Sequence, residues 1–248
     1  MEKSPTYLSI IIPAYNEEAR ILPTLEKVEA FKMSQPYATE VIVVDDCSTD
    51  RTSSVIRTFI SGKSGYTVIT HRVNTGKGGA IRDGMVAATG KFRLFSDADL
   101  SVPIEEVNSL LKYIKGSNSG YDIVIGSRRV NGARIEIRQP FFREFAGRIF
   151  SVLVRVVTLP RFLDTQCGFK LFTAEAGLKV FPLQTIQGFG FDVELLFIAR
   201  KVFNFRILEA PVRWSDSPAT KVRLLKDSLN MFADLLRIRL NSLKGKYT

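Results

Sequence analysis

Short apolar runs alternate with helical stretches along the first half of the chain. The runs are rich in β-branched residues and typical of buried strands, whereas the segments between them repeat apolar residues at helical spacing. The pattern predicts strands over 7–13, 40–46, 66–71, 92–97 and 121–127. It predicts helices over 17–33, near 79–88 and over 103–115, and a further helix that follows a cap at Ser48 or Asp50. Near-continuous apolar strands separated by helices predict a mainly parallel, Rossmann-like α/β sheet with helices on both faces.

The second half contains two longer amphipathic segments. Residues 141–159 are mostly apolar and carry a polar stripe of Glu144, Arg148, Ser151 and Arg155. Residues 222–244 repeat apolar side chains at helical spacing, namely Val222, Leu225, Leu229, Phe232, Leu236, Leu240 and Leu243. Each helix either packs against the domain or a partner, or lies in a membrane surface, and the pattern alone does not decide between these.

The positive charge of the chain is concentrated in its second half. The 248 residues have a net charge of +10, and residues 1–130 carry 16 Lys and Arg against 15 Asp and Glu, whereas residues 131–248 carry 19 against 10. This excess indicates either a basic surface or contact with a polyanion: a phosphorylated substrate, an anionic membrane or nucleic acid.

Composition excludes several classes of protein. The two cysteines, Cys47 and Cys167, do not support a disulfide framework or a cysteine zinc site, and they fit a reducing compartment. The N-terminus does not resemble a signal peptide, and no apolar run reaches the roughly 18 residues that a membrane-spanning helix needs.

Acidic residues follow two of the predicted strands. Asp45 and Asp46 end the second strand, and Asp97 and Asp99 follow the fourth. In a parallel sheet, ligands bind at the carboxyl ends of the strands. The side chains of Asp97 and Asp99 point the same way in an extended segment, so they suit one Mg²⁺ or Mn²⁺ ion whose shell is completed by phosphate. The alternative is an acidic turn that caps the helix beginning at Pro103.

A glycine-rich turn, NTGKGGAIRDG (74–84), follows the third strand and contains Lys77 and Arg82. Backbone amides of such a turn can approach a phosphate. The turn matches neither the dinucleotide fingerprint nor the phosphate-loop pattern, which disfavours a dinucleotide dehydrogenase. His71, the only histidine, is interpreted as a capping or surface residue, and Trp214 as a packing residue.

Eight motifs together resemble a known family. PAYNEE (13–18), VVDDCSTD (43–50), NTGKGGA (74–80) and SDADLS (96–101) resemble the GT-A core of family 2 inverting glycosyltransferases. GSR (126–128), DTQCGFKLF (164–172), GFGFDVELL (188–196) and APVRW (210–214) resemble the polyprenyl-phosphate sugar synthases, most closely the dolichyl-phosphate β-glucosyltransferase branch. Cys47 stands where the family usually has Gly, a conservative change in a turn. Relatives often carry an N-terminal membrane anchor, which we do not expect here.

The resemblance implies a role for each motif. The nucleotide-sugar site would comprise Pro13, Ala14, Tyr15, Glu17, Asp45, Asp46, Lys77, Arg82 and Asp97. Asp46 would accept hydrogen bonds from uracil or ribose, and Asp45 either assists or holds the loop. Asp97 and Asp99 would hold Mg²⁺ or Mn²⁺. The acceptor phosphate would meet Arg128, Arg129, Arg138 and Lys170, and the catalytic residues would be Asp97, Asp99, Arg128 and Asp192.

The implied reaction moves glucose from UDP-glucose to a polyprenyl or dolichyl phosphate. A phosphate acceptor is already largely dianionic at pH 7, so it needs cations more than a base. Residues 1–130 are predicted as the nucleotide-sugar core and residues 131–248 as the acceptor part with interfacial helices. We expect a peripheral protein on the cytoplasmic face of an anionic membrane and no nucleic-acid partner.

Three alternatives stay open at this point. One is a GDP-mannose-dependent polyprenyl-phosphate mannosyltransferase. Another is a soluble family 2 transferase that acts on a sugar hydroxyl, with Asp192 or Glu194 as the base. The third is a basic, non-catalytic module that binds nucleic acid or lipid. The sequence also leaves the oligomeric state and the length of the lipid open.

Overall fold

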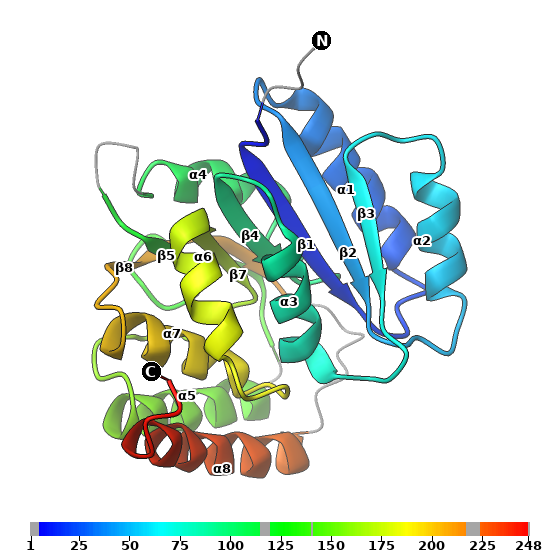
Figure 1. Cartoon of the computed structure of the whole chain (residues 1–248). Helices are drawn as coiled ribbons and strands as arrows, with labels where there is room; N and C mark the ends of the chain where they lie inside the picture. The colour runs from blue at the N-terminus through cyan, green and yellow to red at the C-terminus, as the bar shows by residue number, and fades with distance from the viewer. Residues whose placement is uncertain (1–4, 115–119, 140, 217–223, 248) are drawn as a thin grey trace.

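The computed structural model describes residues 5–114, 120–139, 141–216 and 224–247 of the chain. Within these ranges, seven strands form one sheet in the order β3-β2-β1-β4-β7-β5-β8 (Figure 1). Its strands are β1 (Leu8–Ala14), β2 (Thr39–Asp45), β3 (Tyr66–Thr70), β4 (Phe92–Ser96), β5 (Ile123–Ser127), β7 (Phe169–Thr173) and β8 (Ile207–Pro211). A separate pair joins β6 (Arg134–Ile137) and β9 (Arg213–Ser215).

Helices connect most of the strands. They are α1 (Ile21–Ser34), α2 (Thr52–Ile60), α3 (Gly76–Ala87), α4 (Val107–Leu111), α5 (Phe141–Val157), α6 (Ala174–Val180), α7 (Phe191–Lys201) and α8 (Leu224–Leu243). A short 3₁₀ turn, η1 (Ile104–Glu106), directly precedes α4. A second, η2 (Phe181–Leu183), directly follows α6.

The five strands predicted from the sequence are all present, with bounds within two residues of those expected. The helix predicted over 17–33 begins only at Ile21, because the backbone turns at Asn16 with a φ of 52° and residues 17–20 form a turn. The helix predicted over 103–115 is shorter and consists of η1 and α4. Of the two candidate caps of α2, Asp50 accepts a hydrogen bond from the backbone N–H of Thr52, whereas Ser48 does not.

The sheet is mainly parallel, as predicted, with one inverted strand. The pairs β1–β2, β1–β4, β2–β3 and β5–β8 are parallel. The inverted strand β7 lies between β4 and β5 and is antiparallel to both. The start of β7 therefore lies at the same edge as the carboxyl ends of β4 and β5.

Two apolar clusters cover the two faces of the sheet. Leu8, Ile10 and Ile12 of β1 belong to the cluster that includes apolar residues of α1, α2 and α4. Ile11, between them, belongs to the cluster that includes residues of α3, α6, α7, α5 and α8. Successive strand residues point to opposite faces, so this division is the expected result of burying both faces of a parallel sheet.

The last helix, α8, packs against both α5 and α7. The three helices lie together at the lower left of Figure 1, below α6 and the strands β5 and β7. In the described ranges, no helix has both the length and the apolar character needed to cross a bilayer.

Candidate active site

The acidic strand ends lie on both sides of β1, at the carboxyl edge of the sheet. Asp45 ends β2 and Asp97 directly follows β4, and both strands pair with β1 in parallel. Asp45 is buried, and its Oδ1 accepts a hydrogen bond from Ser48 N at 3.1 Å. The side chain of Asp45 thus holds the loop after β2, which was one of the two roles expected for it.

The turn after β2 also shows what a departure from the family pattern costs. Cys47 has a φ of 63°, in the left-handed region that costs a non-glycine residue about 1–2 kcal/mol. The family's usual glycine is therefore the residue that this backbone favours. Cys47 is not a neutral replacement, contrary to the expectation from the sequence.

Asp97 and Asp99 lie beside two cationic side chains. Lys77 Nζ, from the first turn of α3, is 2.6 Å from Asp97 Oδ1. Arg20 Nη1 is 3.8 Å from Asp99 Oδ2, and Arg20 also pairs with Glu17. The D-x-D pair is therefore built into a network of opposite charges that includes the glycine-rich turn and the start of α1.

The chain approaches Asp97 closely from β7. Asp97 N donates to the carbonyl of Gly168 at 3.1 Å. A Cβ atom built on Gly168 would lie 2.1 Å from Asp97 Oδ2, closer than real Cβ contacts. Only glycine at position 168 leaves room for the carboxylate of Asp97 in its present place.

A buried row of alternating charges continues from Asp97 into the protein. Lys170, which is fully buried in β7, forms an ion pair with the buried carboxylate of Asp192 and donates to the carbonyl of Cys167 at 2.8 Å. Burial opposes the charge of Lys77, but the carboxylates of Asp97 and Asp192 outweigh it and raise the pKa of Lys77. Burial also raises the pKa of Asp192, against the lowering effect of Lys170 and Lys77. Asp97, Lys77, Asp192 and Lys170 thus form one electrostatic unit.

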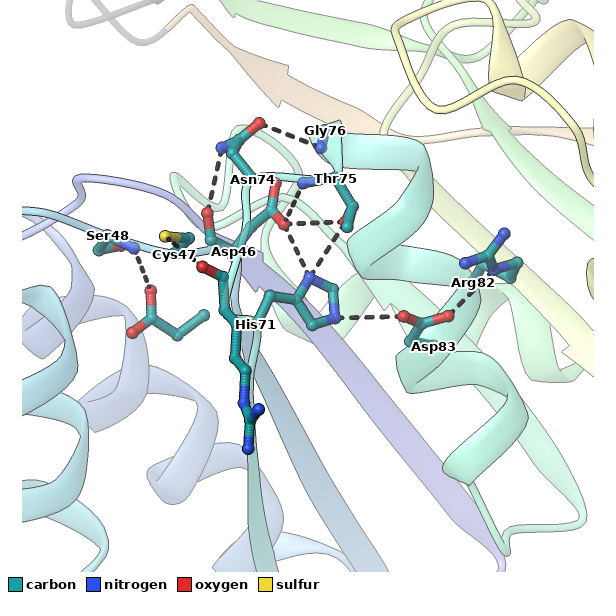
Figure 2. A network of polar contacts seen from close by, with 11 residues as sticks. Asp46, Cys47, Ser48, His71, Asn74, Thr75, Gly76, Arg82 and Asp83 are labelled. Carbon is teal, nitrogen blue, oxygen red and sulfur yellow. Dashed lines mark hydrogen bonds and ion pairs between the residues drawn. The ribbon is translucent and has the colours of Figure 1, made fainter.

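Asp46 is the centre of a second polar network (Figure 2). Its Oδ1 accepts hydrogen bonds from the backbone N–H and the hydroxyl of Thr75, each at 2.8 Å, and lies 2.7 Å from His71 Nδ1. On its other side, His71 Nε2 is 3.2 Å from Asp83 Oδ2 of α3. A Cβ atom on Gly79 would lie 2.5 Å from Thr75 Oγ1, so glycine there allows the hydroxyl to reach Asp46.

At the end of β5, Arg128 is clamped by Asp164. Its Nε and Nη2 donate to the two oxygens of Asp164 at 2.7 and 2.8 Å, and its backbone N–H adds a third bond at 2.9 Å. The Arg128 guanidinium carbon also lies 5.3 Å from the ring centre of Trp214. Burial opposes ionisation of Asp164, but the guanidinium outweighs it and lowers the pKa of Asp164 from 3.8 to about 2.

The remaining predicted residues are only partly brought together. Pro13 and Ala14 end β1 at the site, and Tyr15, next in the chain, is 40 % exposed. Arg82 pairs with Asp83 at 3.0 Å, and Arg129 Nη1 donates to the carbonyl of Leu163 at 3.3 Å. Arg138 is exposed just after β6, and the structure gives it no contact with the D-x-D pair.

The residues at the D-x-D pair fit a hard divalent cation. In the described part of the chain, no group of three or more His, Cys, Asp or Glu side chains is arranged as a metal site. The carboxylate oxygens on offer at the end of β4 are those of Asp97 and Asp99, of which Asp99 Oδ1 also accepts a hydrogen bond from Ser101 N at 3.0 Å. Mg²⁺ typically takes one or two carboxylates and completes its shell with water and substrate phosphate, which this donor set allows.

Sequence reasoning missed several residues of the site. Arg20, Thr75 and Asp83 were not singled out, and His71 was interpreted as a capping or surface residue although its side chain lies between two carboxylates. Gly168 and Asp164 belong to the motif DTQCGFKLF, so the motif itself was the available signal. Trp214 is buried, and its packing role is confirmed.

This arrangement of D-x-D pair, glycine-rich turn and parallel sheet is that of a GT-A transferase. Residues 9–176 match the family described as glycosyl transferase family 2, and the chain belongs to that family. A relative from Dictyostelium discoideum is 33% identical over 96% of this chain and 76% of its own length. A relative from Saccharomyces cerevisiae is 36% identical over 97% of this chain and 76% of its own length. A relative from Homo sapiens is 36% identical over 98% of this chain and 78% of its own length. All three are named dolichyl-phosphate β-glucosyltransferase, and the resemblance inferred from the motifs is confirmed.

Solved structures of similar shape confirm the GT-A fold. Glucosyl-3-phosphoglycerate synthase of Mycobacterium tuberculosis matches with a TM-score of 0.69 and 23% identity, over 94% of this chain and 80% of that chain. A complex of the same enzyme with Mn²⁺, UDP and glucosyl-3-phosphoglycerate matches with a TM-score of 0.67 and 22% identity, over the same 94% and 80%. At this identity the likeness concerns the fold alone.

Proposed function

We propose that this chain transfers glucose from UDP-glucose to dolichyl phosphate or a related polyprenyl phosphate, with inversion at the anomeric carbon. The observation that carries the proposal is the similarity to dolichyl-phosphate β-glucosyltransferases, at 33–36% identity over at least 96% of this chain. Such coverage includes both the donor motifs and the motifs in residues 131–248. We therefore assign residues 1–130 to the donor and residues 131–248 mainly to the acceptor.

The donor nucleotide would lie across the ends of β1 and β2. Tyr15, at the end of β1, offers an exposed aromatic ring for the base, and Asp46 offers a carboxylate to its hydrogen-bond donors. Pro13, Ala14 and the buried Glu17 complete the wall of the site. Lys77 lies at the start of α3, where a helix N-terminus also favours a diphosphate. Arg82 is tied to Asp83 and would act on phosphate less directly than Lys77.

Asp97 and Asp99 would hold Mg²⁺ or Mn²⁺, which, when bound, supplies positive charge to the leaving diphosphate. Lys77 contributes a further positive charge from the protein itself, because its Nζ lies at the same site, 2.6 Å from Asp97 Oδ1. The departing nucleoside diphosphate would thus leave a site where opposite charges are fixed in advance. Such preorganised charge is commonly the largest contribution to catalysis of this kind.

The acceptor phosphate would meet Arg128 at the end of β5. Asp164 and Trp214 orient its guanidinium, and a guanidinium held in one position is well suited to bind phosphate oxygens. Arg129 and Arg138 would add charge around it. Lys170 is fully buried and paired with Asp192, so we assign it to holding Asp192 and the charge row, and no longer to direct contact with the acceptor.

The pairing of Asp192 also bears on the choice of acceptor. A transferase that acts on a sugar hydroxyl needs a carboxylate base within reach of the proton it removes. Asp192 is buried and bound to Lys170, and Glu194 is fully buried and accepts from Thr185, Ile186 and Tyr247. Both candidate bases are committed to contacts within the protein, which favours an acceptor that is already ionised.

A donor and acceptor screen tests the proposal. UDP-glucose and GDP-mannose are each incubated with the protein, with Mg²⁺ or Mn²⁺ or with a chelator, in the presence or absence of a short polyprenyl phosphate. We expect an organic-extractable glucosyl lipid only from UDP-glucose with metal and lipid. Asp99→Asn should abolish it, whereas Glu105→Gln, which removes an exposed carboxylate nearby, should not. Product from GDP-mannose alone, or no lipid product from either donor, would contradict the proposal.

We further propose that α5 and α8 rest on the membrane that holds the acceptor. Apolar side chains on both helices are exposed: Ile149, Val152 and Val156 on α5, and Phe232, Leu236, Leu240 and Leu243 on α8. The last four belong to the apolar stripe predicted from the sequence, whereas Met231, Leu235 and Ile238 pack inward. Arg237, Arg239, Lys244 and Lys246 add exposed positive charge along α8 and beyond it. An exposed apolar stripe with cations beside it suits an anionic bilayer surface.

Liposome flotation tests this membrane surface. We expect the protein to float with vesicles that contain anionic phospholipid and to do so less with neutral vesicles. Leu243→Asp and Val156→Asp, at positions 86% and 76% exposed, should reduce flotation without affecting the core. Met33→Asp, at a position 73% exposed on α1, is the matched control and should float normally. Recovery of the unchanged protein in the unbound fraction would count against the surface.

A further inference from the structure

The hydrogen bonds that the described residues make to the carboxylate of Asp46 all reach the same oxygen, Oδ1. The described contacts of its side chain all fall on Oδ1, which accepts from Thr75 N, from Thr75 Oγ1 and from His71 Nδ1 at 2.7–2.8 Å. A carboxylate oxygen has about two lone-pair positions, so three donors saturate Oδ1. What remains for a ligand is the acceptor capacity of Oδ2.

His71 is held by Asp46 through its Nδ1. Because an ionised carboxylate only accepts hydrogen bonds, the short contact with Asp46 requires the proton on Nδ1. Nε2 lies 3.2 Å from Asp83 Oδ2 without forming a hydrogen bond, and Asp83 in turn pairs with Arg82 at 3.0 Å (Figure 2). The imidazole thus lies between the end of β2 and α3, and its Nδ1 contact holds Asp46 in one orientation.

The bases of nucleotides differ in what they can offer to a single acceptor. The ring edge of uracil carries one N–H, at N3, between two carbonyl oxygens. Guanine carries two adjacent donors, N1–H and the N2 amino group, and uses a carboxylate best when both oxygens accept. Cytosine presents a lone pair at N3 and would face the carboxylate with no N–H at that position. A site that leaves one donor of the ligand without an acceptor discriminates against that ligand.

We propose that His71 and Thr75 determine the nucleotide specificity of this chain. By saturating Oδ1 they leave Asp46 able to accept one N–H of the base, through Oδ2, and this selects uridine diphosphate over guanosine diphosphate. The inference rests on the proposed function, in which Asp46 faces the base. It adds that the choice of donor is set by two residues that need not touch the nucleotide. His71 and Thr75 are therefore positioning residues.

Binding of free nucleotides to the wild-type protein is the first test. UDP, GDP and CDP are titrated in the presence of Mn²⁺ by calorimetry. We expect UDP to bind about tenfold or more tightly than GDP, the size of one hydrogen bond to a charged group, and CDP to bind most weakly. If no nucleotide binds at all, the proposed function fails with the inference. If UDP and GDP bind equally, or GDP binds better, only the inference fails.

Two pairs of variants test the role of the network. Thr75→Val removes the hydroxyl at nearly constant shape, and Thr70→Val is the matched control because Thr70 Oγ1 accepts from Arg57, outside the network. Because two donors still fill Oδ1 after one is removed, we expect Thr75→Val or His71→Leu alone to change the preference for UDP over GDP little, and Thr70→Val to leave it unchanged. The double variant Thr75→Val/His71→Leu leaves Oδ1 with the N–H of Thr75 alone and should reduce the preference by about tenfold. Replacing His71→Leu by His71→Asn in the double variant should largely restore the preference, because the amide can still donate to Asp46.

The ratio of the two affinities separates specificity from a merely structural role. A variant that only loosens the fold weakens UDP and GDP equally and lowers the melting temperature. A loss of preference at unchanged melting temperature, with a raised KM for UDP-glucose and little change in kcat, supports the proposal. Parallel weakening of both nucleotides in the double variant would overturn it. Should that variant fail to fold, a wild-type protein that binds GDP as tightly as UDP, or more tightly, would still overturn the proposal.

Discussion

Replacing Gly168 by alanine should disable the site while leaving the fold intact. The new Cβ would lie 2.1 Å from Asp97 Oδ2 and 2.3 Å from Asp97 Cγ. Real Cβ atoms rarely approach another heavy atom within 3.0 Å, so the carboxylate must retreat by about 0.9 Å. The side chain can rotate away, but it then leaves its place beside Lys77 Nζ.

The expected loss follows from that displacement. A catalytic group misplaced by about 1 Å can cost on the order of 100-fold in rate, so we expect kcat/KM for the donor to fall by about that factor. Local overpacking costs about 1–3 kcal/mol, which a stable domain tolerates. The metal dependence of UDP binding should weaken in parallel, because Asp97 is one of the two proposed metal ligands.

Steady-state kinetics, calorimetry of UDP with Mn²⁺ and thermal unfolding together measure these effects. Gly188→Ala is the matched control, because no atom lies within 4 Å of a Cβ built there. If Gly168→Ala had the activity and the metal response of Gly188→Ala, the position of Asp97 would not matter and the reasoning would be refuted. A collapse of the fold alone would be seen in the melting curve.

Three further changes have definite expected outcomes. Asp164→Asn should cost about 2.5 kcal/mol of unfolding free energy at neutral pH, because Arg128 lowers the pKa of Asp164 from 3.8 to about 2. A carboxylate with a depressed pKa stabilises the folded state above pH 3.8, and this stabilisation is lost as the pH falls toward 2. The difference from wild type in chemical denaturation should therefore vanish over that range. Tyr247→Phe removes a buried 2.7 Å bond to Glu194 and should cost about 2 kcal/mol in the same assay; no loss would mean that this bond contributes nothing. Cys47→Gly should raise the unfolding free energy by about 1 kcal/mol, and an unchanged or lower value would argue against strain at φ 63°.

The strands and the edge that carries the site were predictable because both depend on local patterns. The apolar runs identified five of the strands, and the parallel arrangement then implied that Asp46 and Asp97 share one edge. The glycine-rich turn likewise placed Lys77 near the start of a helix. These are consequences of periodicity and topology, which a single sequence contains.

The contacts across the sheet could not be predicted in this way. Nothing in the sequence near His71 indicates that Asp83, twelve positions later, lies 3.2 Å from its ring. The clamp between Arg128 and Asp164 joins residues 36 positions apart through the inverted strand, whose direction the apolar pattern does not reveal. Nor could the pattern tell which apolar stripe of α8 is buried, because apolar side chains occupy two faces of that helix.

The inverted strand β7 acts as a spacer of fixed width. It separates β4, which leads to Asp97, from β5, which leads to Arg128, so the two strand ends stand two strand widths apart, roughly 10 Å. The donor end and the acceptor end of the site would thus be joined by one continuous hydrogen-bonded sheet, with no hinge between them. We expect evolution to change the lipid or the sugar by altering loops at either end, while the gap that the transferred hexose must bridge stays the same.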